Sequence, residues 1–151
     1  MYVPIFQLQE SPNKSFITGV EDLNLPEMIE YAKEMEGGQE KRVLQFLQDM
    51  ERYGAATLDN GPLKSFSMSK KAKKEYFRDA FFRMEEISSR MTLDDFVSNY
   101  SLFRALEQTL NRELHAYAEY KDTVMTLDYF VRMCLEEDKV YYISHVVLGH
   151  I

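Results

Sequence analysis

The chain is organised around a heptapeptide that occurs twice, as Met91-Thr92-Leu93-Asp94-Asp95-Phe96-Val97 and, 34 residues later, as Met125-Thr126-Leu127-Asp128-Tyr129-Phe130-Val131. Each copy is typical of a helix start. The Thr side chain can accept unpaired N–H groups of the first turn, and the acid suits the positive end of the helix dipole. Leu, Phe and Val then follow at core-facing positions. The copies therefore predict folding rather than chemistry, and two copies are too few for a helical solenoid.

Apolar residues at three- and four-residue spacing predict further helices around this repeat. The expected helices cover residues 26–36, 39–53, 67–90, 92–100, 101–117 and 126–135. Ser69 is the expected cap of the helix over 67–90, because its hydroxyl can accept a first-turn N–H group.

Strand-like composition is concentrated at the two ends of the chain. Residues 2–8 and 15–20 flank a turn-rich segment and predict a hairpin, and residues 139–148 form an aromatic and β-branched run. The predicted fold class is α+β, a predominantly helical domain packed on a small sheet formed by the N-terminal hairpin and the C-terminal strand. We expect one domain over residues 1–151, with the most plausible subdomain seam in the loop-like stretch 55–66.

Charge is unevenly distributed along the chain. The net charge is −7, yet residues 61–90 hold eight Lys or Arg against four Asp or Glu, a net +4. The overall acidity argues against broad coating of nucleic acid or an anionic membrane, while the basic segment can still meet one anionic surface. The four lysines in the first turns of the helix over 67–90 oppose its dipole, and such a local conflict sometimes marks function. The candidate partner-binding or nucleic-acid-binding residues are Lys64, Lys70, Lys71, Lys73, Lys74, Tyr76 and Arg78. The alternative is a solvated face that keeps a Phe-rich helix soluble.

Residue patterns typical of catalysis or cofactor binding are not found in the sequence. The spacing of the three histidines does not match a metal site, and no phosphate-binding loop or nucleophile motif occurs. We therefore expect no catalytic residues, no metal and no cofactor. Cys134 is expected to be a buried core residue, which suits a reducing compartment. With no signal-peptide pattern and no apolar run of about 18 residues, the expected location is cytoplasmic, away from membranes.

Three segments carry a resemblance to a known family. Residues 47–54 with 62–66, and the ending 140–150, resemble the second helix and last strand of bacterial RelE/HigB-type toxins, which are small ribosome-dependent ribonucleases. The resemblance covers about a quarter of the chain. It implies a helix pair packed on a sheet, and RNA contacts by Lys64, Arg78 and His145. Those toxins are typically basic and lack the long, mostly helical insertion of this acidic chain.

The first functional hypothesis is a non-catalytic macromolecule-binding protein, acting as an inhibitor or regulatory accessory through opposed acidic and basic surface regions. Its partner would be another protein, steered by the charge asymmetry. The alternative is an RNA- or DNA-contacting protein, including a divergent RelE/HigB-like ribonuclease toxin, that uses residues 64–78. A small-molecule enzyme stays open as a third class, because a pocket between helices and sheet is invisible in one sequence.

Overall fold

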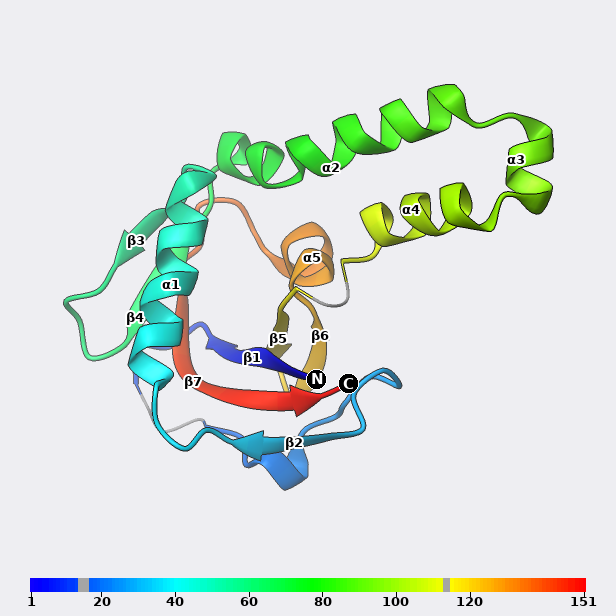
Figure 1. The fold of residues 1–151 in the computed structure, drawn as a ribbon. Coiled ribbons are helices and arrows are strands. Elements are labelled where there is room, and N and C mark those ends of the chain that lie inside the picture. Colours follow the sequence, from blue (N-terminus) through cyan, green and yellow to red (C-terminus); the bar gives the residue numbers. More distant parts are fainter. Residues whose placement is uncertain (14–16, 113–114) are drawn as a thin grey trace.

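The computed structural model describes residues 1–13, 17–112 and 115–151, and its centre is a seven-stranded mixed sheet (Figure 1). The strands follow the order β3-β4-β7-β1-β5-β6, and β2 also pairs with β7. β1 and β5 are parallel, whereas the other neighbours are antiparallel. The strands are β1 (Tyr2–Gln9), β2 (Tyr31–Glu34), β3 (Ala56–Leu58), β4 (Lys64–Ser67), β5 (Tyr117–Tyr120), β6 (Thr123–Thr126) and β7 (Tyr141–His150).

The long strand β7 holds the sheet together. β1 pairs along its whole length, from Tyr2 opposite His150 to Gln9 opposite Tyr142. On the other edge of β7, β4 pairs near its start and β2 near its end. Adjacent residues of a strand point to opposite faces, and both Val146 and Val147 are fully buried. The apolar run at the end of the chain is therefore explained by a strand covered on both sides, and its predicted pairing with the N-terminal strand is confirmed.

The predicted fold class is wrong. The sheet is not a small platform under a predominantly helical domain, because it has seven strands and runs through the whole body. The predicted hairpin does not form: residues Val20–Asp22 make a 3₁₀ turn, and β1 instead lies between β5 and β7. Residues 15 and 16 of the predicted second strand lie outside the described residues.

Four further strands arise where the sequence predicted helix or loop. Part of the predicted helix 26–36 is β2, the end of the predicted helix 101–117 reaches β5, and the loop-like stretch 55–66 contains β3 and most of β4. Short apolar runs fit a helix or a strand equally well by spacing alone. Pairing with a neighbouring strand, which the sequence does not display, decides between the two.

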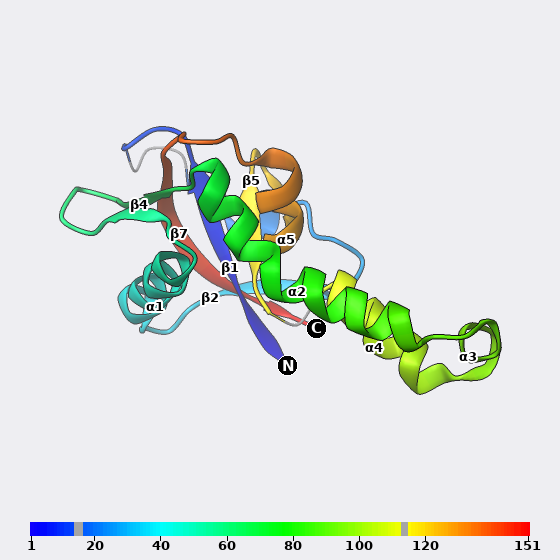
Figure 2. The ribbon, with the colours of Figure 1, turned by 90° about the horizontal axis from the view of Figure 1, so that it is seen from above.

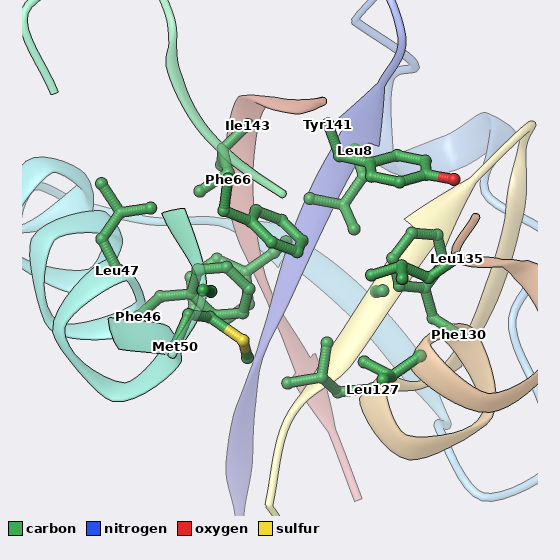
Figure 3. Packing of buried hydrophobic residues seen from close by; sticks show 14 of the residues in the cluster. Leu8, Phe46, Leu47, Met50, Phe66, Leu127, Phe130, Leu135, Tyr141 and Ile143 are labelled. Carbon is green, nitrogen blue, oxygen red and sulfur yellow. The ribbon is translucent and has the colours of Figure 1, made fainter. Parts of the chain in front are cut away.

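One face of the sheet carries the main core (Figure 3). Helix α1 (Gln39–Arg52) supplies Phe46 and Leu47 from one side. From the other side come α5 (Leu127–Tyr129) and the π-helical turn Phe130–Cys134, with Phe130 against Tyr141 of β7. The opposite face of the sheet is covered by the segment that carries Leu23 and Ile29.

The remaining helices form an arm that projects from the sheet. Helix α2 (Lys70–Arg90) leaves the body, α3 (Leu93–Ser98) turns the chain at the far end, and α4 (Tyr100–Leu110) returns (Figures 1 and 2). Ser69 caps α2, as the sequence predicted, and Thr92 caps α3 through a reciprocal capping box with Asp95. None of the described helices is long and apolar enough to cross a membrane.

Candidate functional site

A largely buried cluster of three side chains fixes the arm to the body. Asp128, at the start of α5, accepts a hydrogen bond from the Tyr76 hydroxyl at 2.6 Å. It also accepts two from the Arg112 guanidinium, each at 2.7 Å. The guanidinium carbon lies 5.2 Å from the centre of the Tyr76 ring. Because Tyr76 belongs to α2 and Arg112 follows α4, the same carboxylate holds both long helices of the arm.

The electrostatics of this cluster favour a closed ion pair. Burial and the neighbouring Asp128 charge raise the pKa of the Tyr76 hydroxyl well above its usual range, so it stays a hydrogen-bond donor. Burial opposes the charged form of Arg112, but hydrogen bonds and attraction to Asp128 outweigh it and raise the pKa of the guanidinium. The cluster therefore acts as a charged clamp at the base of the arm.

The predicted binding residues are divided between three places. Tyr76 is buried in the clamp, where it is 2% exposed and offers almost no surface to a partner. Lys64 lies on β4, with its Nζ atom 3.9 Å from a carboxylate oxygen of Glu40. The other five residues lie on the first two and a half turns of α2: Lys70, Lys71, Lys73, Lys74 and Arg78.

Four of these five cations line an open groove of about 680 Å³ along α2. Lys71 is exposed but does not contribute to the lining. The groove also contains three phenylalanines and one acid. The complete lining is Lys70, Lys73, Lys74, Phe77, Arg78, Phe81, Phe82 and Glu137. We call it the basic–aromatic groove.

Helical spacing explains why these residues share one side of α2. Lys70, Lys74, Phe77 and Phe81 are separated by four, three and four residues, which places them on neighbouring turns of one face. Figure 2 shows that the outer part of α2 extends past the sheet. Phe81 and Phe82 remain 51% and 53% exposed.

The charges in the groove are only partly neutralised. Arg78 forms an ion pair with Glu75 at 2.6 Å, and the Lys73 ammonium donates to the Leu135 carbonyl at 3.3 Å. Lys70 and Lys74 form no ion pair with any of the described residues. A fifth cation, Arg132, lies over the Phe77 ring with its guanidinium carbon 4.8 Å from the ring centre. The groove thus combines positive charge with aromatic surface.

The residues implied by the toxin resemblance are not assembled in this groove. Arg78 lines it, but Lys64 and His145 do not. His145 lies on β7, where its Nε2 atom is 2.5 Å from a carboxylate oxygen of Glu34. Among the residues that the structure describes, no three His, Cys, Asp or Glu side chains gather closely enough to hold a metal ion.

The aromatic half of the groove was not predicted from the sequence. Helical spacing alone puts Phe77 and Phe81 on one apolar stripe of α2 that would face the core. Phe77 does pack against the main core, whereas Phe81 is 51% exposed. The signal that favoured an exposed position was the adjacent pair Phe81-Phe82, because neighbouring residues of a helix point about 100° apart and cannot both face one core.

Comparisons with protein-family models, curated proteins and solved structures find no match to this chain.

Proposed function

We propose that this protein is a non-catalytic protein-binding module that holds an acidic amphipathic helix of another protein in the basic–aromatic groove. The observation that carries the proposal is the lining itself, which contains four cations, three phenylalanines and only one acid, Glu137. Such a lining suits a ligand with apolar side chains on one face and carboxylates beside them.

The dimensions of the groove fit a helix of about three turns. From Lys70 to Phe82 the axis of α2 extends about 18 Å, which an amphipathic helix of about 12 residues matches. A half-exposed phenylalanine presents roughly 100 Å² of side chain, so covering it contributes about 2.5 kcal/mol. Phe81 and Phe82 together supply the apolar anchor that most interfaces of this kind require.

The positive charge of the groove favours an acidic partner. Lys70 and Lys74 lack ion-pair partners among the described residues, and a ligand with carboxylates at matching positions supplies them. A basic ligand would add like charges next to four cations, and that repulsion disfavours it. In this role the protein acts on the partner by covering the bound helix, as an inhibitor or regulatory accessory does.

The test uses a fluorescent synthetic peptide of 18 residues, with Leu at positions i, i+3, i+4 and i+7 and Glu on the remaining face. Its anisotropy is followed as the full-length protein is added. We expect micromolar binding that weakens at least tenfold in the Lys70→Gln, Lys74→Gln double variant. Replacing Phe81 by serine should have a similar effect. Lys71→Gln is the control, because it removes one positive charge from the same turns of the helix but outside the groove.

Three results would overturn the proposal: no binding of the acidic peptide, equal binding of a scrambled peptide of the same composition, or equal weakening by Lys71→Gln. Single-stranded RNA and DNA oligonucleotides are titrated in parallel. If they bind more tightly than the peptide and lose affinity in the Lys70, Lys74 variant, nucleic-acid binding replaces the proposed function.

A further inference from the structure

The two copies of the heptapeptide have opposite environments in the structure. In the second copy, Leu127, Phe130 and Val131 are at most 2% exposed and form part of the main core. The same positions of the first copy lie on α3 at the far end of the arm (Figure 1). There Leu93, Phe96 and Val97 are 78%, 56% and 74% exposed. A residue set that builds a core in one place is thus left uncovered in the other.

The uncovered surface extends from α3 onto α4. Tyr100 is 68% exposed and Phe103 is 39% exposed, and the Phe103 ring packs edge-to-face on Phe96 with their centres 5.8 Å apart. We define the tip patch as Leu93, Phe96, Val97, Tyr100 and Phe103.

The arm has little interior of its own. Besides Ala72 and the clamp residue Tyr76 in the first two turns of α2, the described residues of the three arm helices that are buried are Ile87 and Thr109. A pair of helices cannot cover more than one side of each member, and helices with further apolar surface are normally covered by additional helices. The two helices of a second arm would provide that cover.

We infer that the tip patch is a self-association surface, through which the arms of two copies of this chain pack together and form a homodimer. This inference concerns a different surface from the basic–aromatic groove and does not depend on the proposed function.

Charge favours a second copy as the occupant. The chain carries a net charge of −7, so two copies repel each other. Residues 90–104, however, hold two arginines and two aspartates and are neutral, so two copies can meet at the tip without bringing further net negative charge together. The arm also holds the acidic bodies apart: α2 is about 31 Å long, about three times the distance over which salt at 0.1 M screens charge.

The exposed area of the tip patch is sufficient for a dimer. Taking roughly 200 Å² for a whole aromatic side chain and somewhat less for Leu and Val, the exposed fractions leave about 600 Å² of side chain per arm. Two tips then bury about 1,200 Å², the lower limit of stable and specific interfaces. We therefore expect a dissociation constant in the micromolar range.

The test is sedimentation equilibrium of the full chain between about 1 and 100 µM. The wild type should form dimers. The Leu93→Asp, Val97→Asp double variant should stay monomeric, because its dimer dissociation constant should be at least 30-fold higher. Both side chains are mostly exposed, so the variant should keep the circular dichroism of the wild type. Leu58→Asp is the matched control, since Leu58 is 57% exposed on β3, away from the arm, and should leave the dimer intact.

A wild type that stays monomeric at 100 µM would overturn the inference, as would a double variant that still forms dimers or a Leu58→Asp variant that loses them. A second measurement locates the contact. With Cys134 replaced by alanine, spin labels placed at Ser101 should lie closer together across the dimer than labels placed at Asp59. The reverse order would move the interface away from the tip. Binding of the acidic peptide is expected to be unchanged in the tip variant.

Discussion

Replacing Asp128 by alanine tests whether one carboxylate fixes the arm to the body. The side chain is 6% exposed and accepts three hydrogen bonds, one from Tyr76 and two from Arg112. Its removal leaves a phenol and a guanidinium without acceptors in a largely buried place. The free-energy cost is larger for the guanidinium than for the phenol, since a buried charge without its partner is costly.

The expected loss follows from the burial of the two donors. Breaking a buried ion pair typically costs 3–5 kcal/mol. The Arg112 side chain is 28% exposed, so water can restore part of its solvation, and the lower end of that range applies. We expect the free energy of unfolding to fall by about 3 kcal/mol. For a chain of this length that lowers the melting temperature by roughly 6–12 °C.

The assay is urea unfolding followed by circular dichroism, and the chain supplies its own control. Asp94 occupies the same position in the first copy of the heptapeptide and is exposed. Its replacement by alanine should lower the free energy of unfolding by no more than about 0.5 kcal/mol. Replacing Asp128 by leucine together with Arg112 by methionine should recover part of the loss, since no unpaired charge remains. A loss below about 1 kcal/mol for Asp128→Ala, or equal losses at Asp94 and Asp128, would refute the clamp.

Three further outcomes follow from the same structure. Phe130→Ala should lower the free energy of unfolding by about 3–5 kcal/mol, because Phe130 is fully buried. Phe96→Ala should lower it by under about 1 kcal/mol at protein concentrations too low for dimers, because Phe96 is 56% exposed. Urea unfolding measures both. Ser69→Ala should cost about 1 kcal/mol in the same assay, because the Ala72 N–H loses its cap. Burial raises the pKa of Glu119 above its ordinary 4.5. Its carboxyl therefore favours folding most when protonated, and that contribution is lost as the pH rises through the folded pKa. Between pH 4 and 7 the free energy of unfolding should therefore fall less in Glu119→Gln than in the wild type. Equal pH profiles of the two proteins would contradict the raised pKa of Glu119.

The candidate site was predictable in its charge but not in its shape. The four lysines near the start of α2 stand out in the sequence because they oppose the helix dipole. Their division into a groove-lining set and an outward-facing Lys71 depends on which side of α2 meets the body. The clamp could not be predicted from the sequence either, because Tyr76, Arg112 and Asp128 are far apart along the chain. Only the packing of α2 and α4 against α5 brings them together.

The same division applies to the fold. Local chemistry determined α1, α2 with its Ser69 cap, the helix starts at Thr92 and Thr126, and the terminal strand β7, because spacing and capping act between residues a few positions apart. Tertiary structure decided what local chemistry left open. The short runs that became β2 and β5 are strands because β7 and β1 offer them backbone partners. The two heptapeptide copies specify the same helix start, but only the position of each in the fold buries Phe130 and exposes Phe96. Burial depends on which surfaces meet, and contacts between distant segments are not encoded in any one stretch of sequence.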